Sequence, residues 1–185
     1  MKSSKTDIVI LPATAQDAPF IARNILDAMG VKEISGMHKE LTEICRKEDT
    51  LYSWKRTYIV QVGGTPAGSL TSYDGAMYKE LKDRTFSIIS AKTGEDYSEV
   101  GEETRPDEYY LDSLAIIPEY RFHHLGSLLI DNALHIAQGL GFTLVSLIAE
   151  KDKVWLQHYY ESLGFYADGE LLFFGHQYVR MIQEI

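Results

Sequence analysis

The segment spanning residues 109–141 most constrains the fold, because it predicts a strand, a short turn and a helix in direct succession. Residues 109–117 form an apolar-rich run typical of a strand. Over residues 124–138, apolar side chains recur at spacings of three and four, as in an amphipathic helix. A helix that opens directly after such a turn brings free backbone N–H groups and the positive end of its dipole to one point. We therefore expect an anion-binding site beside Arg121 and Gly126.

Two motifs in this half of the chain resemble signatures of one protein family. The pyrophosphate-loop pattern of the GNAT family of N-acetyltransferases, Arg/Gln-x-x-Gly-x-Gly/Ala, is similar to the run from Arg121 to Gly126, with His124 in the place of the first glycine. The family's Leu-Tyr-Glu-Lys-Leu-Gly-Phe signature resembles the run from Tyr160 to Phe165. A dinucleotide fingerprint and a Walker loop are both disfavoured, because their glycines and their Gly-Lys-Ser/Thr run are missing from the sequence.

The resemblance implies an α/β (α+β) fold class with a GNAT-like mixed, mostly antiparallel central sheet, a parallel splayed strand pair and helices on both faces. Gly68 predicts a bulge or a close backbone approach in the second strand of a hairpin. No repeat or linker interrupts the chain, so we expect a single domain over residues 1–185. The predicted elements are a strand at 8–11, helices at 14–29 and 35–48, a hairpin over 58–73, a short helix at 77–83, a strand at 109–117, a helix at 124–138, a strand at 143–149, a helix at 154–163, and strands near 165–167 and 178–182.

The resemblance also implies acetyl-CoA as the co-substrate. Backbone groups of the strand would pair with its pantetheine arm as an added strand would, and N–H groups of the turn and first helical turn would hold its pyrophosphate. The His124 side chain is expected to face solvent, since only backbone donors are required; the alternative is that it crowds the pyrophosphate. No metal is expected, because His123 and His124 are adjacent on a turn and lack a third ligand. The implied cofactor-binding residues are Leu114, Ala115, Ile116, Arg121, His123, His124, Leu125, Gly126 and Ser127.

Tyr160 is the catalytic acid that the resemblance implies. In the family, the corresponding tyrosine often protonates the departing CoA thiolate, and a phenol suits that leaving group. The alternative is a tyrosine packed in the core with a buried hydroxyl partner. The asparagine that commonly opens this helix in the family falls near Lys153, so that contact is not carried over.

A proton acceptor is also needed, because an ammonium group must lose a proton before it attacks a thioester. Asp112 lies in the strand before the turn, where alternation places it on one face with Leu114 and Ile116. Burial among apolar neighbours raises the pKa of a carboxyl group, which favours a base. A structural carboxylate that caps nearby backbone donors is an equally supported alternative. Glu108 and Glu150 are second choices for the base.

Residues 95–108 form a strongly acidic segment, with seven acids and one base, Arg105. This composition favours a solvated mobile loop. The alternative is an acidic lip that recruits a cationic amine.

Composition narrows the class of protein. Acidic residues outnumber basic ones by 27 to 18, for a formal net charge of −9. The sequence lacks the Lys/Arg cluster that nucleic-acid binding requires. No apolar run approaches a membrane span, the first residues lack a signal peptide, and the one cysteine, Cys45, cannot form an internal disulfide. We therefore expect a cytoplasmic protein in which Cys45 is a packed hydrophobe rather than a nucleophile. An exposed hairpin or C-terminal strand leaves a homodimer open.

Together these features favour an acetyl-CoA-dependent N-acetyltransferase that moves an acetyl group to a primary amine by direct attack on the thioester. The amine acceptor is a small molecule or a peptide, and polyamines, aminoglycosides, amino acids, peptide N-termini and lysines all fit. The alternative is a non-catalytic acyl-CoA-sensing or protein-binding module with the same fold, which the departures at His124 and Lys153 favour.

Overall fold

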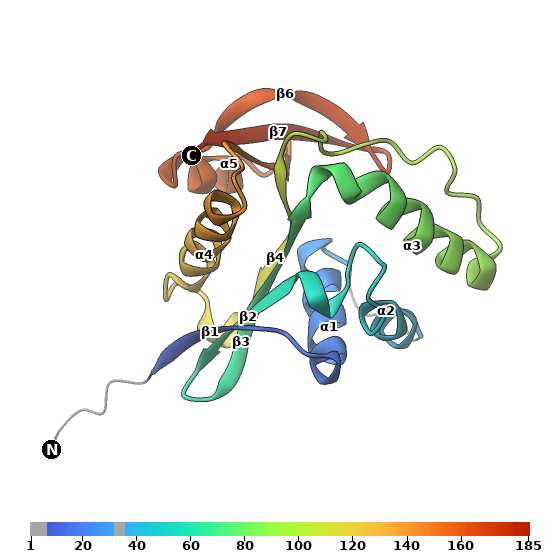
Figure 1. The fold of residues 1–185 in the computed structure, drawn as a ribbon, viewed down its shortest axis with the longest axis horizontal. Coiled ribbons are helices and arrows are strands. Elements are labelled where there is room, and N and C mark those ends of the chain that lie inside the picture. The colour runs from blue at the N-terminus through green and yellow to red at the C-terminus, as the bar shows by residue number, and fades with distance from the viewer. Residues whose placement is uncertain (1–6, 32–35) are drawn as a thin grey trace, which may run out of the picture. The chain divides into compact units, whose positions relative to one another are not determined.

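The structure is a computed structural model, and it describes residues 7–31 and 36–185. Figure 1 shows the helices and strands of the described chain. The strands are β1 (Ile8–Pro12), β2 (Thr57–Val62), β3 (Thr65–Asp74), β4 (Tyr109–Ile116), β5 (Leu144–Glu150), β6 (Tyr166–Phe173) and β7 (His176–Glu184). The α-helices are α1 (Ala18–Ala28), α2 (Met37–Cys45), α3 (Tyr78–Thr93), α4 (Leu125–Gly139) and α5 (Val154–Ser162). Short 3-10 turns are found at Ala15–Asp17, Trp54–Arg56, Gly75–Met77 and Pro118–Tyr120.

The strands form one seven-stranded sheet in the order β1-β2-β3-β4-β5-β7-β6. Strands β4 and β5 are parallel, whereas the pairs β1–β2, β2–β3, β5–β7 and β6–β7 are antiparallel. This arrangement confirms the predicted fold class, a mixed and mostly antiparallel sheet with one parallel pair.

The chain groups into two compact units. Unit 1 comprises the described residues up to 48 together with 52–71 and 113–132, and unit 2 comprises 49–51, 72–112 and 133–185. Strands β3 and β4 and helix α4 run from one unit into the other. The grouping therefore leaves the single domain over residues 1–185 as a prediction.

In unit 1, the hairpin β2–β3 turns at Gly63 and Gly64, which both have positive φ, as a tight two-residue hairpin turn requires. The register of β2 and β3 shifts between Val60 and Gln61, opposite Gly68. A Cβ at Gly68 would lie 2.3 Å from Ile116 Cδ1. The bulge and the close approach predicted at Gly68 are therefore both confirmed.

The two helices of unit 1 begin close to their sequence signals. Asp17 accepts hydrogen bonds from both the backbone N–H and the hydroxyl of Thr14, each at 2.7 Å, just before α1 begins. Helix α2 is shorter than the predicted 35–48, and residue 35 lies outside the described residues. Cys45 is fully buried, and burial raises the pKa of its thiol to about 12. It is thus a packed core residue, as predicted, because the nucleophilic thiolate is strongly disfavoured there.

In unit 2, helix α3 runs for 16 residues, whereas the sequence predicted a short helix at 77–83. The prediction was wrong because the stretch lacks a strong amphipathic pattern, although no glycine or proline interrupts it before Gly94. Gly94 ends the helix in the left-handed conformation, φ 77°. The helix and the coil after it lie along the outer edge of this unit (Figure 1).

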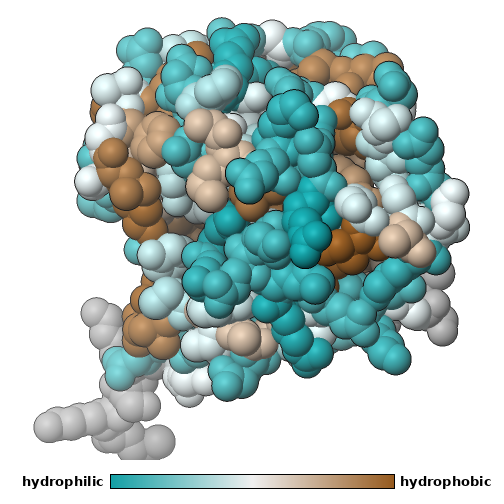
Figure 2. All heavy atoms as spheres, turned by 45° about the vertical axis from the view of Figure 1, so that its right-hand side comes forward, coloured by the Kyte–Doolittle hydropathy of each residue, from teal (hydrophilic) through white to brown (hydrophobic). Residues whose placement is uncertain are grey.

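Among the described residues, none of the helices has the length and apolar character needed to span a membrane. Figure 2 shows that hydrophilic residues dominate one face of the molecule, with hydrophobic side chains scattered between them.

Candidate active site

The turn after β4 in unit 1 carries the predicted anion site. Strand β4 ends at Ile116, and the 3-10 turn Pro118–Tyr120 leads into an exposed segment that ends where α4 begins. The Nε of Arg121 donates a hydrogen bond of 3.1 Å to the carbonyl oxygen of Ile116. The Arg121 side chain is therefore tied to the end of β4 and holds the base of the turn.

Two residues of this turn have left-handed backbone conformations that are uncommon outside glycine. Phe122 has φ 66° and His124 has φ 58°, and the Phe122 side chain is 99% exposed. His124 is the position at which the family pattern has glycine, and the positive φ gives a physical reason for that preference. Histidine tolerates this region better than most residues, and its exposed side chain leaves the backbone accessible.

Helix α4 begins at the end of this turn. The first helical hydrogen bond described runs from Leu128 N–H to His124 O, at 3.2 Å, and the Ser127 hydroxyl donates to the same oxygen at 2.8 Å. The N–H groups of residues 125–127 precede that bond, so they belong to the donors that a helix cannot satisfy internally. Leu125 is buried and anchors the helix, whereas Gly126 and Ser127 are partly exposed. These donors, with the helix dipole, fit a diphosphate.

The end of β4 offers backbone groups for an extended ligand. Leu114, Ala115 and Ile116 are all half-buried. The N–H of Ile117 donates to Ala67 O on β3 at 2.9 Å. Because backbone groups alternate along a strand, those of Ile116 face the opposite edge of β4. Pairing of this edge with a pantetheine arm stays a prediction.

Asp112, in unit 2, lies in β4 just beyond its pairing with β5. That pairing joins Tyr109 to Val145 and Tyr110 to Ser146, and in the described part of unit 2 it stops there although both strands continue. Asp112 is half-buried and accepts a hydrogen bond of 2.6 Å from the Tyr73 hydroxyl. Its carboxylate is thus held by a side chain of β3.

A second carboxylate near Asp112 was missed by sequence reasoning. Glu103 is only 9% exposed and accepts a hydrogen bond of 2.6 Å from the Tyr110 hydroxyl. Burial, with the negative charge of Asp112, raises the pKa of Glu103 to about 8. The only available signal was the alternation that puts Tyr110 and Asp112 on one face of β4, because Glu103 lies in the acidic segment predicted to be solvated.

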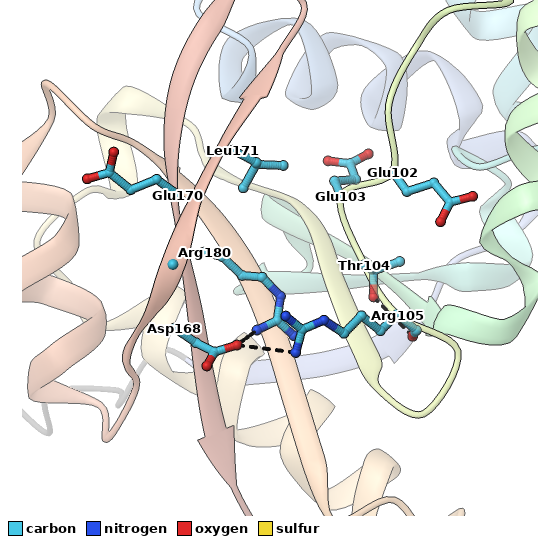
Figure 3. A pocket seen from close by; sticks show the side chains of 9 residues that line it. Glu102, Glu103, Thr104, Arg105, Asp168, Glu170, Leu171 and Arg180 are labelled. Carbon is cyan, nitrogen blue, oxygen red and sulfur yellow. Dashed lines mark hydrogen bonds and ion pairs between the residues drawn. The ribbon is translucent and has the colours of Figure 1, made fainter.

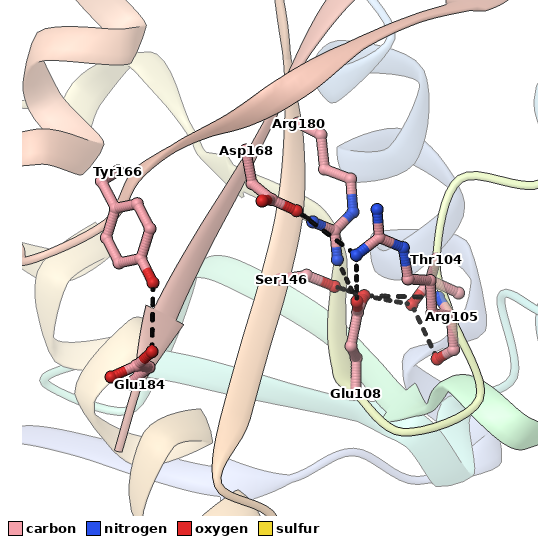
Figure 4. A network of polar contacts seen from close by, with 8 residues as sticks. All are labelled: Thr104, Arg105, Glu108, Ser146, Tyr166, Asp168, Arg180 and Glu184. Atoms are coloured by element: carbon pink, nitrogen blue, oxygen red, sulfur yellow. Dashed lines mark hydrogen bonds and ion pairs between the residues drawn. The ribbon is translucent and has the colours of Figure 1, made fainter.

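Glu108, a second choice for the base, is instead the centre of a buried polar network (Figure 4). Its carboxylate accepts hydrogen bonds from the Ser146 hydroxyl at 2.6 Å and from the guanidinium of Arg180. Arg180 also donates to Asp168, and Arg105 lies 3.4 Å from the same carboxylate. Glu108 is fully buried, so its bonds fasten the segment before β4 to β5 and β7.

A hollow of about 210 Å³ opens beside this network (Figure 3). Its lining combines side chains of the acidic segment with those of the β6–β7 hairpin, and Glu103 is among them. The acidic segment is therefore only partly solvated, since Glu103 and Glu108 are both buried. The lining residues are Glu102, Glu103, Thr104, Arg105, Asp168, Gly169, Glu170, Leu171 and Arg180.

Comparison with known proteins decides the family. The model of the acetyltransferase (GNAT) family matches residues 29–165, which is most of the chain and includes the turn, the start of α4 and α5. This protein belongs to the GNAT family. The resemblance seen in the sequence is thereby confirmed, and the chain is a member of a family of acetyltransferases.

Solved structures with the same GNAT fold cover nearly the whole chain. A crystal structure described as an acetyltransferase is 25% identical, with a TM-score of 0.77 over 96% of this chain and 99% of its own. An N-acetyltransferase from Staphylococcus aureus Mu50 is 19% identical, with a TM-score of 0.79 over 94% and 99%. The NatC complex bound to Gag peptide and CoA is 15% identical, with a TM-score of 0.59 over 97% and 99%. No curated protein sequence matches the chain.

Tyr160, which matches the family signature, lies in α5 of unit 2. Its side chain is 8% exposed, and its ring contacts those of Tyr159 and Phe165, with centroids 5.5 Å and 6.0 Å away. Burial raises the pKa of its hydroxyl, so the phenol is protonated at neutral pH. Among the described residues, no hydrogen bond to this hydroxyl is found. The ring is thus packed, but the buried hydroxyl partner of the structural alternative is not seen in that part of the chain.

The remaining residues named from the sequence are Glu150, His123 and His124. Glu150 pairs with Lys153 at 2.7 Å, so the residue in the place of the family's asparagine is paired with the end of β5. His123 and His124 are both exposed. In the described parts of the chain, no group of three metal-binding side chains is present.

Proposed function

We propose that this GNAT protein is an acetyl-CoA-dependent N-acetyltransferase that transfers an acetyl group to a primary amine. The observation that carries the proposal is the turn between β4 and α4, where positive-φ residues and the first helical N–H groups stand at the family's pyrophosphate motif. The relative bound to CoA supports the choice of the donor.

The chain's own residues have distinct roles in this proposal. The backbone of the turn at 121–127 binds the pyrophosphate, and the edge of β4 at 114–116 aligns the pantetheine arm. Asp112 takes the proton of the substrate ammonium group, which frees the nitrogen lone pair for attack. The new C–N bond forms as the C–S bond breaks, and Tyr160 donates its proton to the sulfur that leaves. The nitrogen gives up a second proton as it becomes an amide, and that proton restores the Tyr160 hydroxyl.

The environments of Asp112 and Tyr160 suit these roles. Asp112 is half-buried and held by Tyr73, so its position is fixed while part of the residue stays exposed. Tyr160 is protonated because burial raises its pKa. No covalent intermediate on the protein is needed, since the amine attacks the thioester directly.

The direct experiment measures release of free CoA from acetyl-CoA by the purified protein over a panel of amines, with the acetylated amine identified by mass. We expect saturable, amine-dependent release, and Asp112→Asn should lower kcat/KM by about 10²- to 10⁴-fold. Asp107→Asn is the matched control. It removes an exposed carboxylate from the acidic segment before β4 and should retain activity. Tight acetyl-CoA binding without turnover across the panel would favour the acyl-CoA-sensing module instead.

A further inference from the structure

Two tyrosines of unit 2, which contact one another, each hold one carboxylate. The Tyr73 hydroxyl donates to Asp112 and the Tyr110 hydroxyl donates to Glu103, each at 2.6 Å. The tyrosine rings contact one another, with centroids 5.7 Å apart and planes at 57°. The four side chains therefore form one cluster, which we call the carboxyl pair with its two tyrosines.

Three of the four side chains of the cluster are buried. Tyr110 is fully buried, Tyr73 is 3% exposed and Glu103 is 9% exposed. Asp112 is more open than its partner carboxylate. Asp112 is thus the more exposed of the two carboxylates, whereas Glu103 lines the hollow.

The charges around Glu103 disfavour a second negative charge in the pair. Burial and Asp112 raise the pKa of Glu103, whereas hydrogen bonds from Tyr110 and Tyr78 and the charge of Lys82 lower it less, which leaves the pKa at about 8. Lys82 is partly engaged elsewhere, since its Nζ donates to Val100 O at 2.7 Å. The titratable and charged groups that face Glu103 are Tyr73 on β3, Tyr78 and Lys82 on α3, Tyr110 and Asp112 on β4, and Tyr178 on β7.

We propose that Glu103 is a positioning residue for the proton acceptor, and that its charge raises the proton affinity of Asp112. This inference rests on the proposed function. A lone aspartate is a weak base for an ammonium group, because its ordinary pKa lies several units below that of the amine. Two interacting carboxyl groups instead release their protons in two widely separated steps. The pKa of the second step is a property of the pair rather than of either residue alone.

The proton balance follows from this coupling. The fully ionised pair accepts one proton from the substrate ammonium group through Asp112, the more exposed carboxylate, and shares it, so the pair retains one negative charge and the amine becomes neutral. The neutral amine then attacks the thioester, and the pair releases its proton to solvent after the product departs. A base whose proton affinity lies near the working pH is the most effective kind.

The first test is the pH dependence of kcat/KM for wild type, Glu103→Gln and the control Glu102→Gln. Glutamine keeps an oxygen that accepts from Tyr110 but cannot ionise. Wild type should gain activity as pH rises through about 8, the pKa of Glu103. Glu103→Gln should lose that rise and fall roughly tenfold at high pH. Glu102 is exposed in the same segment, so its variant should follow wild type.

The second test needs no turnover and measures melting temperature against pH for the same three proteins. The pKa of Glu103 is about 8 in the folded protein, whereas the ordinary carboxyl pKa is 4.5. Between these two pH values the folded state binds more protons than the unfolded state, so wild type becomes less stable as pH rises across that range. Glu103→Gln should escape this loss, and its melting temperature should rise relative to wild type between these pH values. Glu102→Gln should show no such divergence.

Each pattern of results has one meaning. Divergent melting curves with a lost alkaline rise in Glu103→Gln support the coupled pair. Parallel melting curves, or divergent curves with an unchanged pH–rate profile, overturn it. Absence of turnover in wild type overturns the proposed function and this inference with it, whereas a wild type that turns over while the variant matches it overturns the inference alone.

Discussion

At His124 the backbone conformation matters more than the identity of the side chain. The residue has φ 58°, its side chain is exposed, and its carbonyl oxygen accepts the first helical hydrogen bond of α4. A glycine at this place would adopt the same conformation at no steric cost. We therefore expect histidine to replace the family's glycine without changing what the turn presents.

We predict opposite outcomes for two substitutions at this residue. His124→Gly should retain acetyl-CoA affinity and stability, whereas His124→Val should weaken both, with a loss of stability of about 1 kcal/mol, because a β-branched residue strongly disfavours positive φ. Calorimetric titration and denaturant unfolding measure the two effects. Weakened binding in both variants, with stability retained in His124→Gly, would show that the imidazole itself binds.

Tyr160 allows a prediction that separates binding from chemistry. Tyr160→Phe should keep acetyl-CoA affinity and lower kcat by about 10²-fold or more, since it removes only the proton donor from a packed ring. Tyr159→Phe, next to it in α5, is the matched control and should turn over normally. An unchanged kcat in Tyr160→Phe removes Tyr160 from the mechanism.

Among the elements, the segment before β4 depends most on a single side chain. Glu108 is fully buried and accepts hydrogen bonds from Ser146 on β5 and Arg180 on β7. The turn that precedes α3 lies against the same segment, because a Cβ at Gly75 would come 2.0 Å from Arg105 O. The segment is therefore fixed from two sides, which positions Glu103 as well.

We predict that Glu108→Gln lowers the free energy of unfolding by about 3 kcal/mol or more, because it leaves the buried Arg180 without one of its charged partners. Urea unfolding followed by far-ultraviolet circular dichroism measures this loss. The matched control is Glu102→Gln, which removes an exposed charge from the same segment. A loss below about 1 kcal/mol, the range of exposed ion pairs, would mean that the network contributes no more than a surface pair.

Some helices and strands can be predicted from the sequence better than others. Strand β4 and helices α4 and α5 were predicted within a residue or two, since their apolar periodicity and their flanking glycines and prolines agree. Helix α3 was predicted too short because its pattern is weakly amphipathic, so that length depends on packing rather than on local signals. Glu103 was predicted to be solvated because its neighbours in sequence are acidic. Its burial depends instead on the contact with Tyr110.

For the whole molecule, the family and the proposed acyl-donor half of the site follow from short local motifs. The run from Arg121 to Gly126 is contiguous, so its chemistry is visible in sequence. The carboxyl pair joins Glu103 to Asp112 through side chains from β3 and β4, and no spacing rule links such positions. The hydrogen bonds of Glu103 and Asp112 come from contacts between distant segments, which is why the sequence suggested Asp112 but not Glu103.

The most direct test of the account is the melting temperature of the purified protein with and without acetyl-CoA, with free CoA alongside. A ligand present at about 100 times its dissociation constant adds roughly 2.7 kcal/mol of stability, or several degrees for a chain of this size. We predict a clear rise with both acetyl-CoA and free CoA, because the pyrophosphate loop binds the part they share. No rise with either species would contradict the account, since the turn at 121–127 would then not be an acyl-donor site.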